Sequence, residues 1–141
     1  MSIDVVIINT HASFSVLSDN KEWYLSMADI AKLDNKDVGV LILYGCDAGN
    51  LDYVGSNVAS SFALKVNGAQ VFASDGSVTA GRLNQAWIPA KYTWFLGPIT
   101  YVSRGRGWVV YRANEGWGFQ AYRTGKTAMS LKGLLDFRVP N

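Results

Sequence analysis

Cysteine and histidine, the side chains best suited to nucleophilic catalysis near neutral pH, each occur once in this chain of 141 residues. The thiolate of Cys46 would be the nucleophile, and the imidazole of His11 would accept or deliver the proton. A lone cysteine is more often a small buried apolar residue, and a lone histidine is more often a satisfied turn residue. The case for chemistry therefore depends on whether the fold brings the two together.

Three short apolar runs have the composition of strands that are buried on both faces: residues 4–9, 38–44 and 70–74. Helix signals lie between them, and crossover helices between buried strands imply a parallel sheet. In such a sheet, ligands bind outside the carboxyl ends of the strands. His11 follows the first run, Cys46 the second and Asp75 the third, so we expect all three at one edge.

Residue types around Cys46 suit a catalytic turn. Gly45 and Gly49 allow the backbone to turn tightly beside the cysteine and leave its amide free. The Cys46 amide, with one from Ala12 or Ser13, would hold an oxyanion.

Two crossover helices are expected. Ser26 begins a short helix with Asp29 three residues later, which is a variant of the capping box. A second helix has Ser56 or Asn57 as its N-cap, and Gly68 is a suitable residue to end it.

Antiparallel pairing is expected in two other parts of the chain. Segments 14–17 and 23–25 flank a polar tetrad, which is typical of a hairpin. After Pro89 the chain is rich in aromatic residues, with expected strands at residues 93–95, 99–103, 108–112 and 118–123. Residues 131–137 form a last short helix or strand. The elements together predict an α/β fold, a small mainly parallel three-layer sandwich with an antiparallel, aromatic-rich C-terminal extension.

Length and composition narrow the possible classes. The length suits one domain, 1–141, with an α/β core over 1–80 and the extension over 81–141. The net charge of +2 is too small to indicate nucleic acid, and no apolar run is long enough for a transmembrane helix. One cysteine and one histidine do not suggest a metal site or another cofactor. Five basic residues are interpreted as a solvated sheet face rather than a phosphate-binding patch: Arg104, Arg106, Arg112, Arg123 and Lys126.

The N-terminus bears on localisation. No basic region precedes its apolar run, so no signal peptide is expected. We expect a soluble protein, either cytoplasmic or released from a larger protein, that does not bind membranes.

The order of these elements resembles that of the caspase-like cysteine peptidases, the clan that includes caspases, legumain, gingipain, clostripain and separase. An apolar strand ends in histidine (IINTH), and a hairpin and a short helix follow. A second apolar strand ends in Gly-Cys-x-x-Gly (GCDAG), before an amphipathic helix and a third strand (SNVASSFALKVNGAQVFASDGSV). The pattern is most similar to the bacterial CHAT-type branch and covers about residues 5–78.

The resemblance implies a caspase-like fold and a peptidase that acts on peptide or protein substrates. Cys46 matches the nucleophile and His11 its partner, and cleavage after a defined P1 residue proceeds through an acyl-enzyme without a metal. Members that cut after Arg or Lys pair the P1 cation with an acidic residue, for which Asp75 is a candidate and Asp47 a competitor. The other interpretation of Asp75 is a simple turn residue.

Three features differ from the family's pattern, and one is that residues 89–141 do not align with the half of the family that forms its S1 pocket. Glycine usually follows the histidine, where this chain has Ala12. A strand and helix normally precede the histidine strand, so the domain is either minimal or has its first strand on a preceding segment. An uncovered sheet edge would favour a homo-oligomer or a partner chain.

Two other functions are compatible with the residues. One is a non-catalytic caspase-like interaction module, or part of a bacterial effector or toxin system. The other is a ligand-binding surface, for sugars or other molecules, on the C-terminal tryptophans Trp87, Trp94, Trp108 and Trp117. Aromatic residues in strands are more often core residues, which favours the first of the two.

Overall fold

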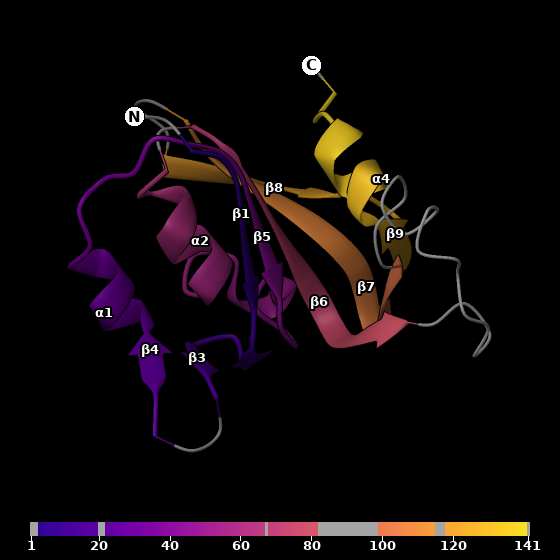
Figure 1. Ribbon diagram of the computed structural model, residues 1–141, viewed down its shortest axis with the longest axis horizontal. Coiled ribbons are helices and arrows are strands. Elements are labelled where there is room, and N and C mark those ends of the chain that lie inside the picture. The colour runs from indigo at the N-terminus through magenta and orange to yellow at the C-terminus, as the bar shows by residue number, and fades with distance from the viewer. Residues whose placement is uncertain (1–2, 20–21, 67, 82–98, 115–117, 141) are drawn as a thin grey trace.

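The computed structural model describes residues 3–19, 22–66, 68–81, 99–114 and 118–140 (Figure 1). Within them, the main sheet has six strands in the order β1-β5-β6-β7-β8, with β9 also paired to β7. These strands are β1 (Ile3–Asn9), β5 (Val38–Tyr44), β6 (Gln70–Gly81), β7 (Ile99–Asn114), β8 (Gly118–Arg123) and β9 (Ala128–Ser130). No helix in these ranges is long and apolar enough to cross a membrane.

The first three strands of this sheet form the predicted parallel part. β1 pairs with β5 in parallel, ending with Asn9 opposite Tyr44, and β5 pairs with β6 in parallel, starting with Val40 opposite Gln70. From β6 onward every pair is antiparallel. The aromatic-rich strands therefore extend the same sheet, so the sheet as a whole is mixed.

A second, three-stranded antiparallel sheet is formed by the segment of the chain between β1 and β5. It is formed by β2 (His11–Ala12), β3 (Val16–Ser18) and β4 (Tyr24–Ser26), with Leu17 opposite Leu25. β3 and β4 are the expected hairpin. Because His11 pairs with Ser18, the hairpin also holds the segment that contains the histidine.

Helices lie on both faces of the main sheet, with α1 (Met27–Ala31) and α2 (Val58–Ala63) on one face and α4 (Leu131–Asp136) on the other (Figure 1). Alternate residues of β5 face the two cores, as the two-residue period of a strand requires. Leu41 and Leu43 pack in the core with α1 and α2, whereas Ile42 packs with Leu134 of α4 in the second core. The fold is a mixed α/β domain with two apolar layers.

The expected helix starts are confirmed. Ser26 and Asp29 form a capping box at α1, and Asn57 and Ser60 form one at α2. The expected end of α2 is wrong, because the helix stops at Ala63. Gly68 instead lies in the turn that leads into β6, with a φ of +81° that suits glycine.

The expected end of the third strand is also wrong. β6 continues past Ser74 to Gly81, and the two expected strands at 99–103 and 108–112 are one strand, β7. Asp75 lies opposite Gly107, but Ser77 lies opposite Ser103, so β7 carries extra residues in a bulge. A Cβ on Gly105 would lie 1.8 Å from the Asp75 carbonyl oxygen, so glycine is required for the two strands to approach. Gly105, which lies between the two expected strands, therefore serves a bulge.

The remaining C-terminal expectations have mixed outcomes. Residues 131–137 contain the short helix α4, and 118–123 form β8 as expected. The five basic residues of the expected solvated face are exposed. Trp108 is fully buried, which removes it from a ligand-binding surface. Segment 93–95, Trp87, Trp94 and Trp117 lie outside the described residues.

Candidate functional site

His11 and Cys46 follow two strands that are hydrogen-bonded to each other. β1 and β5 end in the pair Asn9 and Tyr44, and the Thr10 amide still donates to the Tyr44 carbonyl over 3.2 Å. His11 lies two positions beyond Asn9, and Cys46 lies two positions beyond Tyr44. The parallel register therefore brings the two segments to the same edge of the sheet, as the sequence predicted.

A second contact joins the same two segments. A Cβ added to Gly45 would lie 2.5 Å from the Ala12 Cβ and 3.1 Å from the Thr10 carbonyl oxygen. The residue before the cysteine therefore packs directly against the residue after the histidine. The His11 side chain is exposed and Cys46 is half-buried, and no hydrogen bond joins them among the described residues.

The Cys46 thiol has a defined orientation. Its Sγ accepts a hydrogen bond of 3.4 Å from the amide of Val78, which lies in the part of β6 beyond the expected strand end at Ser74. The Cys46 amide donates to no carbonyl in the described part of the chain. The Ser13 amide, a sequence candidate for the same role, donates to the Val16 carbonyl over 2.9 Å and is occupied. Ala12 lies in β2, and its role as an oxyanion donor stays a prediction.

β5 ends at Tyr44, and beyond that point the turn after Cys46 is hydrogen-bonded to β6 in its stead. The Asp47 amide donates to the Gly76 carbonyl over 2.8 Å, and the Gly49 amide donates to the Ser74 carbonyl over 2.9 Å. The buried Ser74 hydroxyl donates to the Gly45 carbonyl over 2.8 Å. Both ends of the turn are thus bonded to one strand.

Two buried side chains from distant elements hold the far end of the turn. The Tyr111 hydroxyl of β7 donates to the Gly49 carbonyl over 2.8 Å. The Asn57 amide group donates to the Tyr111 oxygen over 2.8 Å and to the Asn50 carbonyl over 3.1 Å. Burial raises the pKa of Tyr111 to about 12, so its hydroxyl stays a donor at physiological pH.

Sequence reasoning missed this polar network. Asn57 was expected only as a helix cap, and Tyr111 only as one aromatic residue of a strand. The contact between them spans 54 positions, and no local spacing indicates it. The one signal was a cap residue amid apolar neighbours, since a buried Asn must find partners for its amide.

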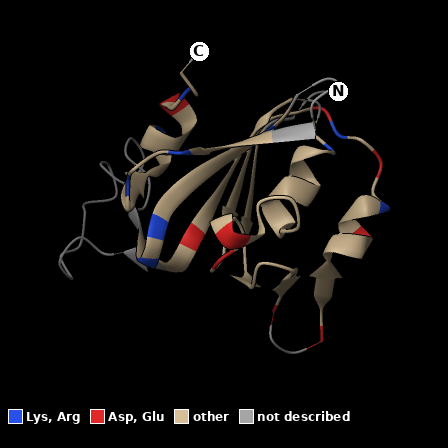
Figure 2. Ribbon diagram, turned by 180° about the vertical axis from the view of Figure 1, so that it is seen from behind, with Lys and Arg blue, Asp and Glu red and all other residues tan. Residues whose placement is uncertain are grey.

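Asp75 is an anchor of the sheet bend rather than a free carboxylate. Its side chain is buried, and it accepts hydrogen bonds from the Leu51 amide at 3.2 Å, the Arg106 amide at 2.9 Å and the Arg106 Nε at 2.5 Å. Arg106 also bonds Asp52 at 2.9 Å. Acidic and basic segments lie side by side where β6 and β7 bend (Figure 2). The turn after Cys46 is thereby tied to the bulge of β7.

Asp47, the other acidic candidate, is differently placed. Its backbone is left-handed, with a φ of 57°, and its side chain is half-buried. No hydrogen bond or ion pair of its carboxylate occurs among the described residues. Within the same ranges, no three His, Cys, Asp or Glu side chains are grouped so that they could hold a metal ion.

The fold and the site together define a mixed α/β domain with a cysteine turn and a histidine segment at one edge of its parallel strands. Comparisons with protein-family models, with curated proteins and with solved structures gave no match to this chain.

Proposed function

We propose that this protein is a cysteine peptidase of caspase-like type, in which Cys46 is the nucleophile and His11 its proton-transfer partner. The observation that carries the proposal is the position of the two residues, each two places beyond the last hydrogen-bonded pair of β1 and β5. Parallel strands present their carboxyl ends to one ligand site. The chain's single thiol and single imidazole both follow such ends.

The proposed reaction has two steps. His11 takes the proton of the Cys46 thiol, the sulfur attacks the carbonyl carbon of the scissile peptide, and the carbon–nitrogen bond breaks as the amine leaves with that proton. Water then gives a proton to His11 and attacks the thioester, the carbon–sulfur bond breaks to release the acid, and His11 returns the proton to the sulfur. The Cys46 amide supports the oxyanion in both steps.

The hydrogen bonds around the turn support a catalytic role. Ser74, Tyr111 and Asn57 are all buried, and they bond carbonyl groups on both sides of Cys46. A turn held in this way keeps its amide oriented before substrate arrives, so little reorganisation accompanies the reaction.

Specificity for a basic P1 residue is part of the proposal. Because both Asp75 oxygens already accept hydrogen bonds, Asp47 is the better candidate to pair with a P1 cation. Asp47→Asn should then raise KM for Arg and Lys substrates more than for others.

Alkylation and cleavage together test the proposal. Iodoacetamide should label wild-type Cys46, the only thiol, faster than it labels a free cysteine. Wild type should also cleave members of a peptide library, and the Cys46→Ala variant should not. His11→Ala should lower the cleavage rate by about 10²–10⁴-fold, the usual contribution of a general acid–base. Lys32→Ala, an exposed change on α1's C-cap, is the control and should leave it unchanged. Labelling no faster than a free thiol, without cleavage, contradicts the proposal.

A second candidate, a module that binds another chain at the sheet edge, is favoured by one observation. β1 pairs only with β5 in the described part of the sheet, and it exposes two apolar side chains, Val5 at 38% and Ile7 at 43%. An exposed apolar edge strand is a template for pairing. Light scattering that shows a monomer up to high concentration, in a protein that cleaves peptides, contradicts this candidate.

A further inference from the structure

An ion pair between a buried and an exposed residue lies where β6 and β7 bend. The Asp75 side chain is buried, whereas Arg106 belongs to the bulge of β7 and has 37% of its side chain exposed. The Arg106 Nε donates to Asp75 Oδ2 over 2.5 Å, and the Arg106 amide donates to the same oxygen over 2.9 Å. A buried carboxylate needs a counter-charge and hydrogen bonds, and Arg106 supplies both.

The same pair reaches the segment that follows the Cys46 turn. Asp75 Oδ1 accepts a hydrogen bond from the Leu51 amide over 3.2 Å. The Arg106 Nη2 bonds Asp52, the next residue, over 2.9 Å. A guanidinium bonds two carboxylates at once because its donors form a planar fork, which the ammonium group of lysine lacks. Residues 51–52 are thus joined to the bulge by two separate bonds.

The backbone on either side of Asp75 holds the turn itself. The Ser74 carbonyl accepts from the Gly49 amide over 2.9 Å. The Gly76 carbonyl accepts from the Asp47 amide over 2.8 Å. The position of Asp75 in β6 therefore determines where both of these acceptors lie.

The bend also brings a hydrogen-bond donor to the thiol. Val78 lies three positions beyond Asp75, and its amide donates to Cys46 Sγ over 3.4 Å. Gly76 lies between them with a φ of +144°, and a Cβ there would lie 2.4 Å from the Ser103 carbonyl oxygen. An N–H donor at the sulfur favours the thiolate, which is the reactive form. The donor is in place only when β6 is held in this bend.

We propose that Arg106 is a positioning residue for the Cys46 thiol and acts on it through Asp75. This role rests on the proposed function, in which the turn is oriented before substrate arrives. Without Arg106 the Asp75 carboxylate is buried without its counter-charge, so residues 74–78 of β6 must shift to relieve it. A displacement of about 1 Å at a reacting group can cost about 10²-fold in rate.

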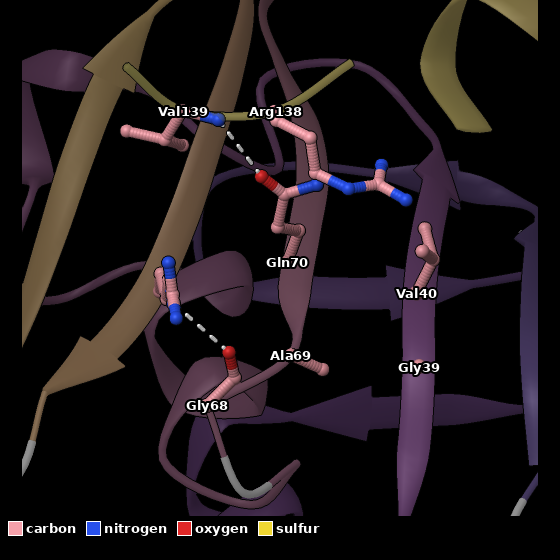
Figure 3. A pocket seen from close by; sticks show the side chains of 8 residues that line it. Gly39, Val40, Gly68, Ala69, Gln70, Arg138 and Val139 are labelled. Carbon is pink, nitrogen blue, oxygen red and sulfur yellow. Dashed lines mark hydrogen bonds between the residues drawn. The ribbon is translucent and has the colours of Figure 1, made fainter. Parts of the chain in front are cut away.

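Arg112 provides a matched control on the same strand. It is exposed, and its Nε donates to the Gly68 carbonyl over 3.1 Å. That carbonyl lies at the opposite end of the parallel strands from Cys46, in a pocket that Gly39 and Val40 also line (Figure 3). Arg112→Gln therefore removes one charge and one Nε bond from β7 and leaves the buried carboxylate untouched.

The rate at which iodoacetamide alkylates Cys46 in the full chain tests the proposal. Arg106→Gln should slow alkylation by about tenfold or more. Arg106→Lys, which keeps the charge but lacks the fork, should slow it by at least about threefold. Arg112→Gln should stay within about twofold of wild type. A wild-type rate in either Arg106 variant, or an equal loss in Arg112→Gln, overturns the proposal.

Steady-state kinetics separate positioning from a structural or substrate-binding role. For peptides that wild type cleaves, Arg106→Gln should lower kcat by about 10–100-fold and leave KM within about twofold. A raised KM at unchanged kcat would overturn the positioning role. Because alkylation needs no substrate, a wild type that cleaves no peptide contradicts the proposed function, while the alkylation rates still decide the role of Arg106.

Amide hydrogen exchange of the wild-type protein needs no variant. The Leu51 and Arg106 amides both donate to Asp75, so a single opening event should expose both. Their protection factors should agree within about tenfold. A larger difference would show that the turn and the bulge open independently, which overturns the proposal.

Discussion

The Gly49 carbonyl, which closes the turn after Cys46, is bonded to a hydroxyl 62 positions away in the chain, that of Tyr111. The same hydroxyl accepts a hydrogen bond from Asn57. Both partners are buried, so removing the hydroxyl leaves a donor and an acceptor without this bond. An unsatisfied buried polar group typically costs about 1–3 kcal/mol.

We therefore expect Tyr111→Phe to lower the free energy of unfolding by about 1–3 kcal/mol at pH 7, as measured by urea denaturation. It should also slow alkylation of Cys46, since the turn loses a support. Tyr122→Phe is the matched control, because the Tyr122 ring packs against Phe137 and its hydroxyl makes no hydrogen bond in the described part of the chain. That variant should stay within about 0.5 kcal/mol of wild type. Equal losses in both variants would contradict the network.

The raised pKa of Tyr111 gives the same prediction a pH dependence. Burial moves the pKa from the ordinary value of 10.0 to about 12, so the unfolded chain loses this proton first as the pH rises. The stability that Tyr111 contributes is complete below pH 10 and is lost between about pH 10 and 12. Over that window, wild type should lose stability more steeply than Tyr111→Phe, by at most about 1.4 kcal/mol per pH unit. Parallel curves would contradict the assignment.

At the scale of elements, the close packing of Gly45 against Ala12 couples the ends of β1 and β5. Gly45→Ala should force the two segments apart and lower the free energy of unfolding by about 1–3 kcal/mol, the usual cost of overpacking. Labelling of Cys46 should slow as well. Ala12→Gly removes the atom that the new Cβ would meet at 2.5 Å, so the double variant should recover part of both losses. Strictly additive effects in this double-mutant cycle would show that the contact does not couple the strands.

The elements that could be predicted from sequence are those with local causes. The parallel strands have continuous apolar runs, and the helix starts at Ser26 and Asn57 have capping side chains. The union of 99–103 and 108–112 in one strand has no local cause. It depends on Gly105 fitting against the Asp75 backbone, which is a contact between strands. For the same reason, the ion pair of Asp75 with Arg106 was not foreseen.

At the scale of the whole molecule, β1 lies at the edge of the described part of the sheet, and we propose that other chains pair there. Wild type should self-associate at high concentration through the apolar side chains that β1 exposes, and Ile7→Lys should prevent it by placing a charge on that edge. Leu64→Lys is the control, since Leu64 is 55% exposed at the C-cap of α2, outside the sheet. Analytical ultracentrifugation distinguishes the variants. Equal association of Ile7→Lys and Leu64→Lys would exclude β1 as the interface.

The candidate site could be predicted only as a pair of residue types at two strand ends. Their side-by-side placement followed from parallel register, which apolar runs and crossover helices already indicate. The supports of the turn, Ser74, Asn57 and Tyr111, come from three separate elements and have no shared motif. Tertiary contacts of this kind leave no periodic signal in one sequence.

The hydrogen bonds around residues 45–50 also determine whether this turn would keep its shape when grafted into another protein. Suppose that the peptide Gly-Cys-Asp-Ala-Gly alone were moved to the end of another parallel strand. It would lose the bonds that Ser74 and Tyr111 make to its first and last carbonyl groups. It would also lose the bond from Asn57 to the carbonyl group of the next residue. A graft that keeps its shape must carry those three side chains on a neighbouring strand, the next strand and a helix. The part that must be transferred with this cysteine is therefore a section of the sheet with its helix, and not the loop alone.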